Sequence, residues 1–397
     1  MKILFITTHN LATNPRLVKE AKLAMSEGYQ VSVLCFEFNN WSKAINDKIV
    51  ERLKSNIMYY GIPGNRKPFM PWLSSSGIHS FAKVLLKLFP KNSWLLGMRS
   101  NKRAWLLSKE LKKIKETFDL VVAHNPGSFY PAMNYAQKNK IPFGIDLEDY
   151  HPGENSRDEI SPTDRELQNA VLPKASYVSA ASPLILEYAQ KDSNIPLKNG
   201  IVVLNYFPSA EFIKPTTKEN KKLKLVWFSQ QISFNRGLEQ LIPVIKDIPD
   251  IELHLFGNCD EGFKKEWLTG HENILIHSVL PQRELHKKLA EFDMGLALEP
   301  GKDLNNELAI SNKILAYFQA GLYILASNTL AQKQFIDQHP EHGRISELEA
   351  RELAETLNDL LDQKEYIRSK AIARFEKAKV FCWEEESKKL AAIWDSN

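Results

Sequence analysis

The chain has few cysteines and little net charge, and each of these features excludes a class of protein. Its 397 residues contain three scattered cysteines, Cys35, Cys259 and Cys382, whose spacing fits neither a disulfide framework nor a metal-binding motif. This usage is typical of a reducing compartment. A net charge of +4 gives no indication of a nucleic-acid partner, and no nucleic-acid-binding module is recognisable.

Long apolar runs are also missing. No run approaches the length needed to cross a bilayer, and the apolar part of MKILFITTHN is too short for a secretion signal. We therefore read this start as the first strand of a sheet and expect a cytoplasmic protein, with a peripheral position at the inner face of the membrane left open. A G-x-G-x-x-G dinucleotide fingerprint is absent from the first strand–helix turn.

What the sequence does contain is two successive series of short apolar strands separated by amphipathic helices. Aliphatic strands of this kind, covered on both faces, are typical of parallel sheets. The sequence therefore predicts two doubly wound α/β domains. The first series is Ile3–Thr7, Val31–Phe36, Leu120–Ala123, Phe143–Asp146, Tyr177–Ala180 and Ile201–Asn205, and the second is Leu223–Phe228, Ile251–Phe256, Ile274–Ile276, Met294–Leu298 and Leu322–Ala326.

Helical patterns and a polar, proline-bearing seam define the expected domains. The seam is FPSAEFIKPTTKEN, residues 207–220, between the two strand series. We expect a first domain over 1–206, a second over 207–380, and a final helix in 381–397. Predicted helices include Arg16–Glu27, Tyr130–Asn139, Leu238–Ile248, Ala350–Asp362, Tyr366–Ala378 and Cys382–Asp395.

Polar residues follow several strands at their carboxyl ends, where ligands of open α/β sheets bind. In the first domain, Asn10 follows the first strand, Asn14 and Pro15 give a helix start signal, and Arg16 comes next. His124 ends a later strand. We interpret Asn10, Arg16 and His124 as candidates for a cleft between the two sheets.

The densest ionisable cluster follows the strand that ends at Asp146. Glu148, Asp149, His151 and Glu154 come within the next eight residues. Neighbouring carboxylates raise one another's pKa, which suits proton handling near neutral pH. An acidic D-x-E-D metal motif is the alternative interpretation of the same residues.

The second domain offers cations and amides at equivalent places. Ser311 and Asn312 can cap a helix that Gly321 ends, and Lys313 adds a cation to that helix start. Donors at a helix N-terminus form an anion site, and we expect a diphosphate there. Other candidates in this domain are Gln231, Arg236, Asn258, Glu299 and Glu307.

These motifs, taken in order, resemble those of GT-B glycosyltransferases, family 4 in particular. Asn14–Arg16 is similar to the opening of "DPR-x-x-x-E-A", and His124 falls in a strand like "DVVHAHD". Residues 229–237 resemble the phosphate loop "V-G-R-L-x-x-x-K-G", with Gln231 for Arg and Arg236 for Lys. Residues 312–321 resemble "NK-x-x-E-Y-x-x-x-G", with Ala316 for the Glu that holds the ribose.

The resemblance implies a GT-B fold, two doubly wound Rossmann-like domains facing a central cleft, with the last helix packing back on the first domain. It implies a retaining, metal-independent transferase without a cofactor, in cell-surface polysaccharide or glycoconjugate synthesis. The donor would be a UDP- or GDP-linked sugar and the acceptor a glycan or a lipid-linked glycan. Arg236 and Lys313 would stabilise the departing diphosphate, while Glu148, His124 and Glu307 would arrange sugar and acceptor. The expected substrate-binding residues are Arg16, Asn10, Asp146, Asp149, Gln231, Asn258, Glu299, Ser311, Asn312 and Lys313.

Two other functions stay open. One is another GT-B sugar-nucleotide enzyme, such as a nonhydrolysing 2-epimerase. The other is a non-catalytic GT-B module that binds a glycan or a partner, which the losses at Ala316 and Gln231 would permit. Three departures from the family pattern fall in one expected cleft, because Glu148 also stands where the family has a donor-contacting His.

A basic stretch with aromatic residues runs from Phe81 to Glu116, residues 81–116. Lys and Arg outnumber acids there, and Phe89, Trp94 and Trp105 are interleaved with them. Such a segment either lies on an anionic bilayer or forms a solvated helix face. We expect no nucleic acid to bind it.

Overall fold

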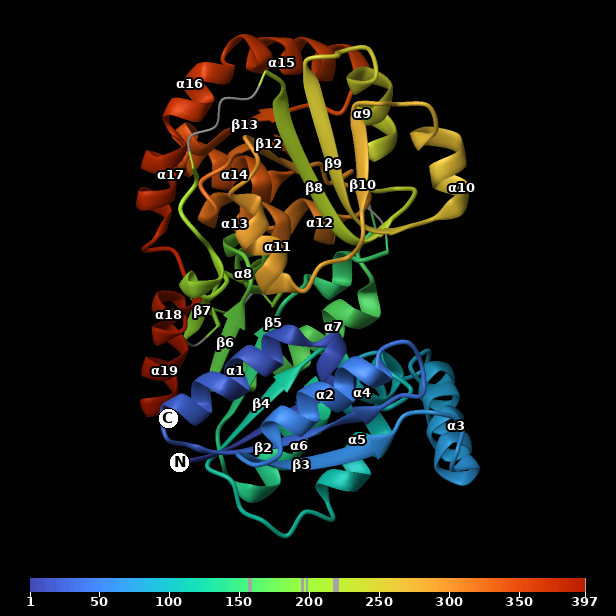
Figure 1. The fold of residues 1–397 in the computed structure, drawn as a ribbon. Helices are drawn as coiled ribbons and strands as arrows, with labels where there is room; N and C mark the ends of the chain where they lie inside the picture. The colour runs from blue at the N-terminus through green and yellow to red at the C-terminus, as the bar shows by residue number, and fades with distance from the viewer. Residues whose placement is uncertain (156–158, 194–195, 198, 217–220, 397) are drawn as a thin grey trace. The chain divides into compact units, whose positions relative to one another are not determined.

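The chain forms two compact units. The computed structural model describes residues 1–397 apart from 156–158, 194–195, 198, 217–220 and 397. Unit 1 comprises Met1–Leu204 together with Ser387–Asn397, and unit 2 comprises Asn205–Glu386 (Figure 1). The last four residues of the predicted seam, 217–220, lie outside the described residues.

Unit 1 is built on a seven-stranded parallel sheet with the order β3-β2-β1-β4-β5-β6-β7. Its central strands β1, β4 and β5 are buried at every position except Lys2, because helices cover both faces and most of the residues are apolar. The strands are β1 (Lys2–Thr7), β2 (Gln30–Glu37), β3 (Ile57–Pro63), β4 (Leu120–His124), β5 (Phe143–Leu147), β6 (Tyr177–Ala180) and β7 (Gly200–Val202).

Local signals begin α1 where the sequence predicts, whereas α6 begins at Pro126, four residues before the predicted start at Tyr130. Asn14 caps α1, since its side chain accepts a hydrogen bond from the Leu17 N–H, and Pro15 is the first helical residue. The helices are α1 (Pro15–Ser26), α2 (Lys43–Leu53), α3 (Phe69–Leu85), α4 (Ser93–Ser100), α5 (Ala104–Leu111), α6 (Pro126–Asn139), α7 (Pro162–Val171), α8 (Pro183–Ser193) and α19 (Lys388–Asp395).

Unit 2 repeats the plan with six parallel strands in the order β10-β9-β8-β11-β12-β13. Trp227 and the aliphatic residues of β8 and β9 form one core with α9 and α15. The strands are β8 (Leu223–Ile232), β9 (Ile251–Cys259), β10 (Ile274–His277), β11 (Met294–Ala297), β12 (Tyr323–Ser327) and β13 (Gly343–Ser346). Two parallel sheets with interleaved helices confirm the predicted fold class.

The helices of unit 2 include the one that the expected diphosphate site uses. Ser311 caps α13, because its hydroxyl accepts a hydrogen bond from the Ile314 N–H. Gly321 follows α13 with a φ of 73°, a conformation that favours glycine. The helices are α9 (Leu238–Ile245), α10 (Glu261–Phe263), α11 (Gln282–Leu289), α12 (Leu304–Leu308), α13 (Asn312–Gln319), α14 (Leu330–Gln338), α15 (Ala350–Asp362), α16 (Lys364–Ser369), α17 (Ala371–Ala378) and α18 (Trp383–Glu386).

The strand predictions missed two edge strands, β3 and β13. Both are partly exposed, and β3 contains Gly61 and Pro63, which weaken a strand pattern in sequence. They form because β2 and β12 offer a free edge to pair with. A second difference is that β8 continues past Phe228 and β9 past Phe256. The pairing of the two strands resumes beyond an irregularity and joins Gln231 to Asn258.

The C-terminal segment is two helices rather than the single one predicted. The chain turns at Ser387, between α18 in unit 2 and α19 in unit 1. In unit 1, Trp394 of α19 is fully buried, packs on Phe5 of β1 and donates its indole N–H to the Tyr177 hydroxyl over 2.9 Å. In unit 2, the Trp383 N–H donates to the Phe207 carbonyl. Each helix is thus held by its own unit.

Candidate functional site

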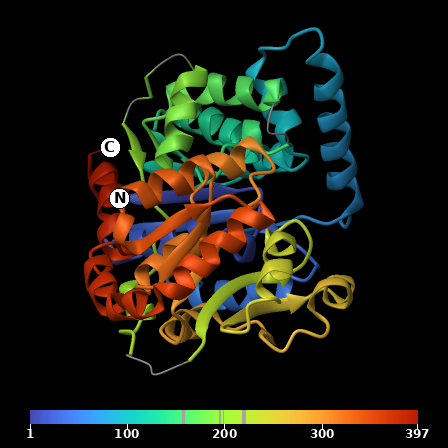
Figure 2. The same ribbon diagram turned by 90° about the horizontal axis from the view of Figure 1, so that it is seen from above.

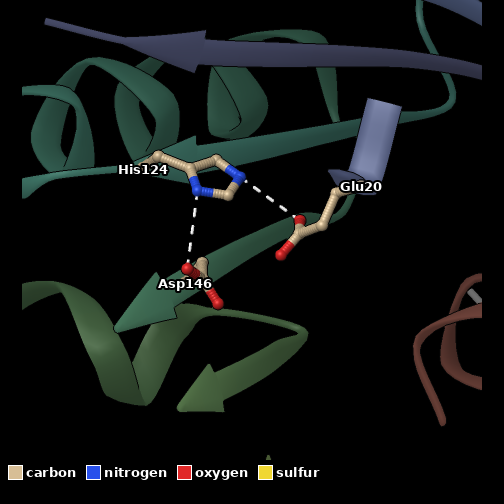
Figure 3. A group of neighbouring side chains, drawn as sticks. All are labelled: Glu20, His124 and Asp146. Carbon is tan, nitrogen blue, oxygen red and sulfur yellow. Dashed lines mark ion pairs between the residues drawn. The ribbon is translucent and has the colours of Figure 1, made fainter. Parts of the chain in front are cut away.

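Four ionisable side chains form a buried cluster at the carboxyl edge of the first sheet. His124 and Asp146 are paired in register on β4 and β5, while Arg16 and Glu20 lie one turn apart on α1. His124 Nδ1 lies 3.4 Å from Asp146 Oδ2, and its Nε2 lies 3.2 Å from Glu20 Oε2 (Figure 3). We call Arg16, Glu20, His124 and Asp146 the buried tetrad.

Arg16 completes the tetrad with a two-pronged contact to Asp146. Its Nε and Nη2 donate to the two Asp146 carboxylate oxygens over 2.7 and 2.8 Å, and Nη1 donates to the Val203 carbonyl over 2.8 Å. The Ser179 hydroxyl donates to the same carboxylate over 2.6 Å. A bidentate guanidinium–carboxylate contact of this kind fixes both side chains.

Two positive and two negative charges balance within the tetrad. Burial opposes charging of His124, but Glu20 and Asp146 outweigh it and raise the His124 pKa to about 10. Burial likewise disfavours ionised Asp146, yet Arg16 and His124 hold its pKa well below the usual range. A buried charge is tolerated when it is paired in this way.

Glu20, His124 and Asp146 are close enough together to be considered as metal ligands. Their donor chemistry argues against it, because a protonated His124 has no lone pair to give and Arg16 occupies both Asp146 oxygens. The cluster therefore fits a charge-balanced ion network better than a metal centre.

Four of the predicted site residues of unit 1 are buried. Arg16, His124 and Asp146 were expected to contact substrate, but each is at most 1% exposed and bound to the others. Asn10 is also completely buried, where it accepts from the Thr13 N–H and donates to the Ser42 hydroxyl. Arg16 is buried because α1 packs on the sheet, His124 and Asp146 are covered because they end the central strands β4 and β5, and Asn10 is held by the turn that precedes α1.

Glu148 and Asp149 lie in the turn after β5 and are only partly buried. Burial and the neighbouring charge of Asp149 raise the Glu148 pKa to about 7, and the charge of Arg16 opposes this rise. A carboxyl group that titrates near neutral pH can exchange a proton with a substrate hydroxyl. Of the predicted acidic cluster, this pair is partly accessible, and Glu154 is exposed and paired with His151.

In unit 2, the start of α13 carries a cation that is already paired. Lys313 Nζ lies 2.6 Å from Glu299 Oε1, just beyond β11, and 5.8 Å from the centre of the Trp227 ring. Ser311 and Lys313 are partly exposed and Asn312 is exposed. The structure thus brings together Lys313 and Glu299, two residues that the sequence assigned separately.

Arg236 reaches the same strand ends from the loop before α9. Its Nη1 donates to the Ser229 hydroxyl over 3.3 Å, and the side chain is exposed. The next residue, Gly237, has a φ of 78°, and a Cβ there would lie 2.3 Å from the Leu298 carbonyl oxygen. This glycine lets the loop lie against Leu298, the residue that precedes Glu299.

Other predicted residues of unit 2 lie elsewhere. Glu307, expected to face a donor sugar, is buried and accepts a hydrogen bond from the Leu330 N–H over 3.1 Å, so it caps α14. Ala316 is completely buried, so its side chain faces the core rather than a ribose. Gln231 and Asn258 are exposed on adjacent positions of β8 and β9.

The sequence analysis gave no role to Glu20. A signal for it was present, because Glu20 follows Arg16 by four residues and such residues share a helix face. Only the burial of that face shows that the pair belongs to the core. A second set of unassigned residues, Trp72, His79, Arg99 and Arg103, lines a pocket that is described below.

Within the described ranges, we find no helix that is both long enough and apolar enough to span a bilayer.

No protein-family model matches the chain, and no curated protein matches it in sequence. Solved structures do match it along its whole length. Sucrose-phosphate synthase from Thermosynechococcus elongatus has a TM-score of 0.68 at 13% identity, covering 100% of this chain and 98% of that one. HepE from Anabaena, solved in complex with UDP, has a TM-score of 0.68 at 16% identity and covers 100% of both chains.

A different enzyme class matches as well. A putative UDP-N-acetylglucosamine 2-epimerase from Listeria monocytogenes has a TM-score of 0.55 at 12% identity, covering 94% of this chain and 90% of that one. Identities this low compare folds and not activities. Together with the two parallel sheets, the matches show that this chain has the GT-B fold, built from two Rossmann-like domains.

Proposed function

We propose that this protein is a glycosyltransferase that moves a sugar from a nucleotide-sugar donor to a glycan or glycolipid acceptor. The reaction we propose is retaining and needs no metal, and it serves cell-surface polysaccharide or glycoconjugate synthesis. The observation that carries the proposal is the start of α13, where Ser311 caps the helix and Lys313 pairs with Glu299 just beyond β11. Carboxyl ends of strands and helix starts are where α/β folds bind diphosphates.

The donor we propose is a UDP- or GDP-linked sugar. HepE, which shares the fold, was solved with UDP, and this supports a uridine nucleotide. In the reaction, the bond between the sugar C1 and the diphosphate oxygen breaks, and the acceptor oxygen bonds to C1. The negative charge that develops on the diphosphate would be stabilised by Lys313, Arg236 and the N–H groups of α13.

The acceptor side of the reaction belongs, in this proposal, to the turn after β5. Ionised Glu148 takes the proton of the acceptor hydroxyl, and Asp149 contacts sugar hydroxyls. The buried tetrad positions this turn, because Asp146 lies two residues before Glu148 and is fixed by Arg16 and Ser179. Arg16, Asp146 and His124 thus act on substrate only through the position of Glu148.

Calorimetry with UDP, GDP and ADP, followed by analysis of sugar products, tests the proposed function. We expect one nucleoside diphosphate to bind with a dissociation constant below the millimolar range and its sugar to appear on an acceptor. Absence of binding by all three at millimolar concentration would leave a non-catalytic module. Binding with an epimerised sugar nucleotide as the product would instead indicate a 2-epimerase, which has the same fold.

The pH dependence of transfer should report on Glu148. Because its pKa is about 7, the wild-type rate is expected to rise with pH through about 7 as the carboxylate forms. Glu148→Gln should remove this rising limb of the pH–rate profile and lower the rate by about 10²–10⁴-fold, the usual contribution of a general base. The measurement is the initial rate from pH 5 to 9 for both proteins.

Asp149→Asn is the matched control, since it changes the neighbouring acid. It should keep the limb but shift it to lower pH, because Asp149 helps to raise the Glu148 pKa. A raised pKa also means that the folded protein holds this proton more tightly than the unfolded chain. The contribution of Glu148 to stability therefore falls as pH rises from 4.5 to about 7. An unchanged limb in Glu148→Gln would exclude Glu148 as the base.

We further propose that α3 lies on an anionic membrane surface, which brings the protein to a lipid-linked acceptor. The stretch predicted for this role, residues 81–116, is only partly available, because α4 and α5 are packed through Leu95, Leu96 and Leu107. The exposed apolar side chains begin earlier, on α3, which lies at the margin of unit 1 (Figure 2). They are Met70, Leu73, Phe81 and Val84 on α3, with Leu88 three residues beyond it, and their intervals of three, four and eight residues place them along one side of a helix.

The charges around this stripe of exposed apolar side chains indicate that it contacts a bilayer rather than another partner. Met70 and Leu88 are 68% and 71% exposed, and Lys83 and Lys87 are exposed beside them. From Arg52 to Lys109 the chain contains eleven Lys and Arg residues and no Asp or Glu. An apolar stripe flanked by lysines, without acids, complements anionic headgroups above an apolar layer.

Sedimentation with vesicles tests this surface. We expect binding to vesicles of phosphatidylglycerol and phosphatidylcholine, little binding to phosphatidylcholine alone, and roughly tenfold weaker binding by Phe81→Ser/Val84→Ser. Tyr366→Ser/Val380→Ser, two equally exposed apolar residues of unit 2, should bind as wild type does. If the α3 variant instead changes only the oligomeric state, the stripe covers a second copy and the membrane proposal is wrong.

A further inference from the structure

Unit 1 contains a second concave site, at the carboxyl end of β3. A cavity of about 340 Å³ opens there between α3 and the segment that joins α4 to α5. Its walls include Trp72, Ser76 and His79 from α3, Arg99 from the end of α4, and Lys102 and Arg103 from the joining segment. Arg99, Lys102 and Arg103 belong to the basic stretch 81–116, whereas the sequence assigned no role to Trp72, Ser76 and His79.

The cavity is positively charged and contains no acid. All the titratable residues that line it are basic, and within the part of the chain that the structure describes none of Arg99, Lys102 and Arg103 forms an ion pair. Cations on a protein surface normally have carboxylates within reach, but the acid-free run from Arg52 to Lys109 supplies none locally. Unpaired cations around a concavity attract an anionic ligand.

Two of the basic side chains are held in place. The Arg103 guanidinium stacks 4.5 Å from the centre of the Phe38 ring, and His79 Nδ1 lies 3.2 Å from the Met98 carbonyl oxygen, to which it donates. Burial lowers the His79 pKa, and Arg99 and Lys102 lower it further. Side chains fixed before a ligand arrives lose less conformational freedom on binding.

We propose that this cavity binds the phosphate or diphosphate group of the acceptor substrate. Arg99 and Arg103 would each donate to phosphate oxygens, Lys102 would add a point charge, and the Ser76 hydroxyl would donate as well. Trp72 offers a ring on which a sugar attached to that phosphate can pack. The acceptor role rests on the proposed function, whereas the binding of an anion at this place does not.

Pyrophosphate is the probe, titrated into the full chain by calorimetry with saturating UDP present, so that a diphosphate site in unit 2 is occupied. We expect one pyrophosphate to bind, and histidine NMR should show the His79 pKa rise on binding, because an anion offsets the neighbouring cations. Arg99→Gln/Arg103→Gln should weaken binding at least about tenfold. Lys22→Gln/Lys48→Gln, which removes two exposed cations of the same unit, should leave the affinity unchanged.

The outcomes separate this proposal from the proposed function. Pyrophosphate binding that depends on Arg99 and Arg103, with no nucleotide binding, would keep the cavity and overturn the transferase. Nucleotide binding without pyrophosphate binding, or pyrophosphate binding that the arginine variants leave unchanged, would overturn the cavity proposal alone. If the double variant unfolds, Lys102→Gln, a change at an exposed residue, repeats the test with an expected loss of affinity of a few fold.

A membrane headgroup is the other possible source of the anion. Binding only to phosphatidylglycerol vesicles, and not to pyrophosphate, would assign these cations to a membrane headgroup and also overturn the proposal.

Discussion

Replacing Arg16 with methionine is expected to lower the free energy of unfolding by about 3–5 kcal/mol, because the change leaves Asp146 charged, buried and without its main partner. Methionine keeps most of the side-chain volume, so lost packing contributes little to this value. Urea unfolding followed by circular dichroism measures this free energy, provided that the two units unfold together or give separate transitions.

Two further variants show whether the loss comes from the charge. Arg16→Met/Asp146→Asn removes one charge of each sign and leaves Glu20 paired with His124, so its cost should be clearly smaller than the sum of the single changes. Lys43→Met breaks an ion pair with Asp47 that also spans four residues of a helix but is more than half exposed, so it should lower the free energy of unfolding far less than Arg16→Met does. If Arg16→Met costs no more than Lys43→Met, the tetrad is not a stabilising network.

Lys313→Met is expected to weaken UDP binding by about 10–100-fold and to slow sugar transfer by about 10²–10³-fold. The first value is the usual contribution of a charged hydrogen bond to an anion, and the second is that of one donor to the charge of a transition state. Calorimetry with UDP and initial rates of transfer give the two numbers. The rate should fall more than the affinity, because charge develops on the diphosphate as the bond to the sugar breaks.

Glu299→Gln is the matched variant for this prediction. The Glu299 carboxylate lies 2.6 Å from Lys313 Nζ and competes with a diphosphate for it. Removing its charge should therefore leave UDP affinity at or above the wild-type value. Lys313→Arg should retain most of the binding, since a cation remains at the helix start. Wild-type UDP affinity in Lys313→Met would show that α13 is not the diphosphate site.

Local chemistry determined much of what was predicted correctly. The buried strands of both sheets were recognised because each contains a short, mostly apolar run. The start of α1 was predicted from Asn14 and Pro15, and the start of α13 from Ser311, because a capping side chain bonds to N–H groups of its own helix. Such interactions involve residues three positions apart, so the sequence alone contains them.

Pairing between distant segments decided the rest. The strands β3 and β13 exist because a neighbouring strand offers an edge, which no local pattern records. The register of β4 against β5 and the packing of α1 convert Arg16, His124 and Asp146 from expected substrate contacts into a buried ion network. Burial changes both the accessibility and the pKa of such groups, and burial is a property of the tertiary structure.

The sequence by itself therefore determined the two-sheet α/β fold, the helix starts and the cations that can meet a diphosphate. Only the tertiary structure decided which polar residues are available to a ligand. Glu148, Lys313 and Arg236 keep accessible side chains, whereas Glu307 is used to cap α14 and Asn10 to hold a turn. The physical reason is that hydrophobic periodicity and capping act within one element, while the partner of a charged side chain comes from elsewhere in the chain.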